Sequence, residues 1–263
     1  MVKGDRVVYQ HFHPDEQTFI EKCLDLIEQV EATYTFQVTE FLNPRQVAIL
    51  LSLVNQTGLS CYASSDYYET EYARVLISPD YYVLNLEDFE ISLLEFSYNT
   101  KFNHLTHRQI LGTLINQLGI KRSIFGDILI AEGKVQILVE TNMASYFSQN
   151  IGKIGKISVS LKEKNLNFLL PRMVHKQEKD ILVTSWRADV IISEILNLSR
   201  SNAVKLIEKD NVKLNYASLG KVSQDLEVGD LLSIRGYGRY EIARENGLSK
   251  SGKIKLTIEK ITE

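Results

Sequence analysis

The basic side chains between residues 187 and 239 have types and spacings that suit the binding of phosphate groups. Arg200 is expected at the start of a helix, where free backbone N–H groups and the helix dipole favour an anion. At about 100° per residue, Ser201, Lys205 and Lys209 fall on the side of that helix opposite its apolar positions. Further basic residues that can meet a nucleic-acid backbone are Arg187, Arg235 and Arg239.

Two short helices and a small sheet are expected to position these residues. The apolar residues of the first helix recur at helical spacing: Val190, Ile191, Ile195 and Leu196. Ser199 can cap the second helix, because its hydroxyl can accept an unpaired backbone N–H. Strands are expected at 212–215 and 231–235, and a hairpin over 240–261 is expected to extend their sheet.

This stretch resembles the S4 RNA-binding domain, or alpha-L motif, of ribosomal proteins, pseudouridine synthases and tRNA synthetases. The matching residues are Arg187 with Asp189, Ser199-Arg200-Ser201, Val212, Asn215 and Val228-Gly229-Asp230. The resemblance predicts an S4-like domain over residues 185–263. Taken alone, Lys205 and Lys209 would more often be the solvated face of a helix, and only the full pattern favours an RNA-binding face.

Composition describes an ordinary globular protein of mixed α and β structure. The 263 residues are 44% hydrophobic and 24% charged, and no apolar run is long enough to cross a bilayer. We therefore expect a cytoplasmic protein with no membrane partner. Cys23 and Cys61 lie in apolar contexts and are expected to be reduced rather than paired in a disulfide.

Charge is unevenly distributed along the chain. Residues 1–95 hold 5 Lys and Arg against 16 Asp and Glu, a net charge of −11. Residues 96–179 hold 12 against 5, a net charge of +7, and residues 180–263 are close to neutral at +1. RNA is therefore expected to approach the middle and the C-terminal part, whereas the acidic head faces another partner or solvent.

The acidic head, residues 1–89, is expected to be a small α+β domain. One helix is predicted from Pro14 to about Thr33, and a second is predicted after Asn43-Pro44, with Asn43 as its cap. Strands are predicted at 59–63 and 72–77, with a shorter one at 81–84.

The middle, residues 90–164, has the element order β-α-β-β-α-β of ferredoxin-like and RRM folds. Its third strand, 134–140, holds no aromatic residue, so RNA would be bound by charge rather than by base stacking on that strand. A merely solvated basic surface is an equally good interpretation. The expected contacts are Lys101, Arg108, Lys121, Arg122, Lys153 and Lys156. The last strand is predicted at 156–161, and residues 165–184 are predicted to be an irregular linker.

Catalytic, cofactor and metal signatures fail in this sequence. The stretch Gly152-Lys153-Ile154-Gly155-Lys156 resembles a phosphate loop, but Ile157 stands where a Ser or Thr must hold magnesium. No cysteine pair or acidic partner supports a metal site near His104 and His107. We therefore expect no catalytic residues, no metal, no cofactor and no small-molecule substrate.

The whole chain also resembles the bacterial YlmH family. Its marks include Phe41-Leu42-Asn43-Pro44, Tyr98 with Lys101-Phe102, Leu105-Thr106-His107-Arg108, Leu111-Gly112, and Gly119-Ile120-Lys121-Arg122 with Gly126-Asp127-Ile128. The resemblance implies a cytoplasmic, non-enzymatic factor that binds rRNA and tRNA on the large ribosomal subunit, in ribosome-associated quality control of stalled peptidyl-tRNA. Two alternatives remain open: a scaffold for cell-division proteins and an RNA-modifying enzyme with an unfamiliar site.

Overall fold

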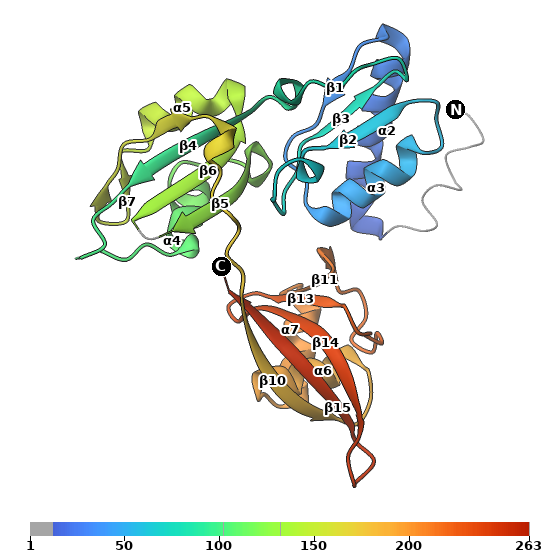
Figure 1. Ribbon diagram of the computed structural model, residues 1–263. Coiled ribbons are helices and arrows are strands. Elements are labelled where there is room, and N and C mark those ends of the chain that lie inside the picture. The colour runs from blue at the N-terminus through green and yellow to red at the C-terminus, as the bar shows by residue number, and fades with distance from the viewer. Residues whose placement is uncertain (1–12, 102, 132, 263) are drawn as a thin grey trace. The chain divides into compact units, whose positions relative to one another are not determined.

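The computed structural model describes residues 13–101, 103–131 and 133–262. They form two compact units, one within residues 16–173 and one of residues 174–262 with residues 13–15. The mixed α and β composition expected from the sequence is confirmed (Figure 1). Among the described residues, no helix is both long and apolar enough to span a membrane.

The first unit begins with an acidic module, residues 16–89. Helices α2 (Gln17–Thr33) and α3 (Pro44–Val54) pack against each other and against a sheet of β1 (Gln37–Val38), β3 (Val75–Ser78) and β2 (Ser60–Ala63). Asn43 caps α3 as predicted, and the Gln46 side chain returns the bond to the Asn43 backbone. The strand predicted at 81–84 is absent.

The rest of the first unit is the basic module, residues 90–173. Its four-stranded sheet has the order β5-β6-β4-β9, with every neighbouring pair antiparallel. The strands are β4 (Ile91–Ser97), β5 (Phe125–Ala131), β6 (Lys134–Glu140) and β9 (Lys162–Lys164). Helix α4 (His107–Gly112) connects β4 to β5, and α5 (Ala144–Asn150) follows β6, so the predicted β-α-β-β-α-β order is present.

One strand of this module was placed too early by the sequence pattern. The prediction of a last sheet strand at 156–161 is wrong: residues 153–158 form a separate hairpin of β7 (Lys153–Ile154) and β8 (Ile157–Ser158). Strand β9 pairs with β4 instead, through Lys164 opposite Leu93 and Lys162 opposite Glu95. All three residues of β9 are exposed, so no apolar alternation marks the strand in the sequence.

The second unit is built on a six-stranded sheet of order β10-β15-β14-β13-β11-β12. Its strands are β10 (His175–Val183), β11 (Val212–Leu214), β12 (Ala217–Ser218), β13 (Leu231–Ile234), β14 (Gly238–Leu248) and β15 (Ile254–Thr262). Helices α6 (Ala188–Leu196) and α7 (Arg200–Glu208) share a core with the sheet (Figure 1). The predicted hairpin and the Ser199 cap are both confirmed.

The predicted linker at 165–184 is also wrong. Residues 166–168 form a short 3₁₀ helix that packs on the basic module, and β10 pairs along its whole length with β15. Strand β10 escaped the sequence analysis because only Ile181 and Val183 are buried, so its first six residues show no apolar alternation.

Candidate nucleic-acid interface

A buried carboxylate holds two arginines together at the start of α7. The Asp189 side chain is 2% exposed and accepts a hydrogen bond from Nε of Arg200 at 2.6 Å. It also accepts two from Arg187, at 3.0 Å from Nε and 3.3 Å from a terminal nitrogen. Burial opposes the ionised carboxyl, but the two guanidinium groups outweigh burial and lower the pKa of Asp189.

Both guanidinium groups stay accessible while they are anchored. The side chain of Arg187 is 38% exposed and that of Arg200 is 58% exposed. A fixed guanidinium presents planar donors that match phosphate oxygens, and less side-chain entropy is lost when the anion binds. The arrangement suits an RNA backbone passing the N-terminus of α7.

The exposed face of α7 continues this basic surface. Ser201, Lys205 and Lys209 are exposed and lie at intervals of four residues, so they line one face of the helix. Arg235 is exposed, and its backbone N–H donates to the carbonyl of Asn211 at 2.8 Å, close to the end of α7. Cations therefore occupy both ends of the helix.

Arg239 lies on the neighbouring hairpin with an aromatic partner. A terminal nitrogen of Arg239 donates to the hydroxyl of Tyr216 at 3.0 Å, and the guanidinium carbon lies 5.6 Å from the centre of the Tyr216 ring. Tyr216 and Asn215 have positive φ angles of 70° and 48°, so both lie in the turn between β11 and β12. Asn215 therefore lies in this turn and not on the predicted strand, and it bonds Asp230 at 2.7 Å.

We name six of these residues together the α7 face: Arg187, Arg200, Ser201, Lys205, Lys209 and Arg235. Arg239 alternates along β14 with Tyr240, which packs in the core beneath the helices, so Arg239 lies on the sheet surface away from α7. The sequence pattern identified each of these residues as a candidate contact. It missed the role of Asp189 as the common anchor of two arginines, and it missed Tyr216. The pairing of Arg187 with Asp189 in the S4-like motif was the available signal.

The basic module's candidate residues fall at two ends of its sheet. Arg108 is exposed in the first turn of α4, and Lys153 and Lys156 are exposed on the β7–β8 hairpin. Lys101 is exposed after β4. Lys121 is exposed at the other end, before β5. These positions remain predicted RNA contacts.

Arg122 has structural partners on the side of the acidic module. Its guanidinium carbon lies 3.7 Å from the centre of the Tyr72 ring and 4.6 Å from that of Phe125, and a terminal nitrogen donates to the Phe125 carbonyl. Nearby, the buried Asp127 carboxylate accepts the backbone N–H groups of Glu71 and Tyr72 at 2.8 and 2.9 Å. Contacts of this kind join the two modules of the first unit.

The sheet face on which an RRM stacks bases is covered in this chain. Leu93 on β4 and Leu138 on β6 are opposite each other and buried, with Phe41, Leu166 and Leu169 packed against them. The amide of the buried Gln136 bonds Glu95, the Phe168 carbonyl and the Leu170 N–H. RNA therefore has to meet the basic module elsewhere than on this face.

Comparison with known proteins places these features in a family. Residues 15–82 match the family description "YlmH, N-terminal", and residues 85–168 match "Putative RNA-binding domain in YlmH". A Bacillus subtilis relative, "Ribosome-associated protein quality control protein P2", is 32% identical over 253 residues, covering 96% of this chain and 98% of its own. The chain belongs to the YlmH family.

A solved structure supports the same relationship. The chain described as "Cell division protein ylmH from Streptococcus pneumoniae" is 44% identical and aligns with a TM-score of 0.54. The match covers 60% of this chain and 96% of that chain. The family predicted from the sequence motifs is therefore confirmed.

Proposed function

We propose that this chain is a non-enzymatic RNA-binding factor that acts on the ribosome in the quality control of stalled translation. Its RNA partners are rRNA and tRNA on the large subunit, and it works in the cytoplasm. The observation that carries the proposal is the Asp189-anchored pair of Arg187 and Arg200 beside the basic face of α7. The name of the Bacillus subtilis relative supports the ribosomal setting.

The proposal assigns an S4-like role to the second unit and a ferredoxin-like or RRM-like role to the basic module. Two helices packed on a small sheet, with the arginines at the start of α7, support the first assignment. The strand order β5-β6-β4-β9 supports the second. The α7 face meets the phosphate backbone, and the binding is mainly electrostatic.

Sedimentation of the full chain with large ribosomal subunits over a range of salt tests the proposal. The variant Arg200→Ala with Lys205→Ala should leave the subunit fraction at a lower salt concentration than the parent protein. Lys250→Ala with Lys253→Ala is a matched control, because it removes the same charge from the turn of the β14–β15 hairpin. Equal release of both variants would refute the α7 face as the RNA surface.

A second function is favoured by the name of the Streptococcus pneumoniae relative, which assigns that protein to cell division. In this alternative the acidic module binds division proteins as a scaffold. Purification of the full chain from growing cells tests it: recovery of ribosomal subunits without division proteins would exclude the scaffold.

An RNA-modifying activity is tested by comparing RNA from deletion and parent cells by mass spectrometry, where a lost modification would contradict the non-enzymatic proposal.

A further inference from the structure

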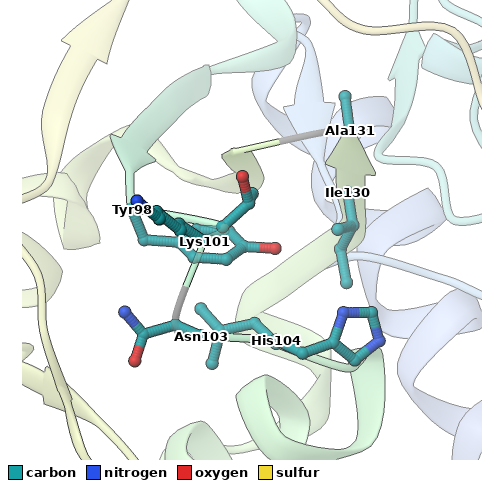
Figure 2. Close-up of a pocket in the computed structure, with 8 residues that line it drawn as sticks. Tyr98, Lys101, Asn103, His104, Ile130 and Ala131 are labelled. Atoms are coloured by element: carbon teal, nitrogen blue, oxygen red, sulfur yellow. The ribbon is translucent and has the colours of Figure 1, made fainter.

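A pocket opens at one end of the basic module, away from the covered sheet face. It has a volume of about 570 Å³ and is lined by Tyr98, Thr100, Lys101, Asn103, His104, Leu105, Ile130 and Ala131. Figure 2 shows Tyr98 and Lys101 on one side, Ile130 and Ala131 of β5 on the other, and Asn103 and His104 along the segment before α4. A volume of this size accommodates a small ligand or a single nucleotide.

Tyr98 is positioned by the framework of the module and not by the loop alone. It directly follows β4, and its backbone N–H donates to the Gly133 carbonyl at 2.9 Å, across the turn between β5 and β6. Its ring is half-buried, and one part packs on the apolar core of the module. Gly133 has a φ of 75°, which favours glycine at this turn.

The groups round this ring are those that recognise a base and its phosphate. The Asn103 amide nitrogen donates to the Asn99 carbonyl at 3.0 Å, which fixes the side chain and leaves its second N–H and its oxygen for a base. His104 offers a second ring. Lys101 supplies a cation at the rim. Aromatic rings beside cations are the combination that binds single-stranded RNA, because every base has a face that can stack.

A neighbouring hollow continues the basic surface on the other side of β4. It has a volume of about 540 Å³, and its polar lining is Ser97, Ser158, Ser160, Lys162, Lys164 and Glu95, whose carboxylate is bonded by the Gln136 amide. Strand β9 pairs with β4 only as far as Glu95, so the end of β4 stays open between the two hollows. A chain of nucleotides that leaves the Tyr98 pocket thus meets hydroxyls and ammonium groups.

We propose that the Tyr98 pocket binds one unpaired nucleotide of RNA, with its base against the Tyr98 ring and its phosphate towards Lys101. This inference rests on the proposed function and adds a second RNA site, distinct from the α7 face. Its selectivity is for unpaired over paired RNA, because a base inside a duplex cannot reach the ring. The α7 face, which meets only backbone, does not make that distinction.

Binding of a fluorescent eight-nucleotide RNA to the full chain, alone and annealed to its complement, tests the proposal by anisotropy. The parent protein should prefer the single strand. Tyr98→Ala should weaken single-strand binding about 5- to 150-fold, the effect of losing one stacked base, and leave duplex binding unchanged. Tyr98→Phe keeps the ring and should retain the preference, which separates stacking from damage to the fold.

A matched control is Tyr146→Ala, which removes an aromatic ring that is 42% exposed on α5 of the same module. Equal affinities of the Tyr98→Ala and Tyr146→Ala variants for the single strand would overturn the pocket proposal. Sedimentation of the same variants with large subunits keeps the two ideas separate. A parent protein that binds subunits without preferring single strands would refute the pocket alone, whereas a parent that binds no subunits would refute the proposed function.

Discussion

Replacing Asp189 by Asn should destabilise the second unit by removing the common anchor of Arg187 and Arg200. The carboxylate accepts three hydrogen bonds from the two guanidinium groups, one at Oδ1 and two at Oδ2, and an Asn oxygen can keep only those at the position that it takes. The arginines are 38% and 58% exposed, so water can replace a hydrogen bond that they lose. Each lost bond therefore costs about 1.5 kcal/mol of stability, the low end of the range for a hydrogen bond to a charged group. The loss of one or two bonds then lowers the free energy of unfolding by about 1.5–3 kcal/mol.

The single tryptophan, Trp186, gives the assay, because it packs beside the core of this unit. Its fluorescence during denaturation of the full chain reports the second unit without interference from the first. Glu208→Gln is the control: Glu208 is exposed at the end of α7, and its replacement should change the free energy of unfolding by less than about 0.5 kcal/mol.

The difference between parent and Asp189→Asn should also depend on pH. The folded pKa of Asp189 is lowered, so its contribution to stability is complete above the unfolded pKa of about 3.9 and is lost as pH falls through the folded pKa. The two proteins should therefore differ fully at pH 7 and converge increasingly below about pH 4.5. Equal stability at pH 7, or a gap that stays constant into acid, would refute the anchoring argument.

Three further changes test the first unit and its thiols. Gly126→Ala should lower the free energy of unfolding by about 1–3 kcal/mol in thermal denaturation, because an added Cβ would lie 2.6 Å from the Phe41 ring. Arg74→Met should lower it by about 3 kcal/mol in urea, because the buried guanidinium donates to the carbonyls of Thr39 and Glu90. Cys23 and Cys61 should react with a thiol reagent only after unfolding, because burial raises the pKa of each thiol to about 12.

Matched controls show what would contradict these three expectations. A Cβ added at Gly58 has no atom within 4 Å, so Gly58→Ala should not cause a clash. Equal losses of stability in Gly58→Ala and Gly126→Ala would contradict the clash with Phe41 as the cause. Arg45→Met removes a partly exposed ion pair with Glu16 and should lower the free energy of unfolding by about 1 kcal/mol or less. An equal loss of stability in Arg45→Met and Arg74→Met would show that burial of Arg74 does not set the size of the effect. Rapid modification of both thiols in the folded protein would contradict the raised pKa values.

Local signals in the sequence were sufficient to predict the helices that have a capping side chain and an apolar face. Ser199 and Thr106 begin their helices where the pattern placed them, since a capping side chain acts on neighbouring backbone groups. The family was also predictable, because its motifs extend along the whole chain. Strands β9 and β10 were not, because their stability comes from pairing with β4 and β15 and their exposed residues leave no alternation.

The partners of individual charged residues could not be predicted from composition. Arg122 is a predicted RNA contact by sequence, but its neighbours Tyr72 and Phe125 come together only in the folded unit. Asp189 likewise acquires its role from Arg200, eleven positions away, when α6 packs on α7. Net charge identifies a basic middle segment, whereas tertiary packing decides which of its side chains remain available.

The most direct test of the central claim is the salt dependence of binding between the full chain and purified large ribosomal subunits. Each phosphate contact contributes about 0.7 to 0.9 to the slope of log affinity against log salt. Arg187→Gln with Arg200→Gln should therefore make the slope shallower by about 1.4 to 1.8, while Lys250→Ala with Lys253→Ala leaves it unchanged. A double-arginine variant with the parent's slope and affinity would contradict the claim that the α7 face holds RNA.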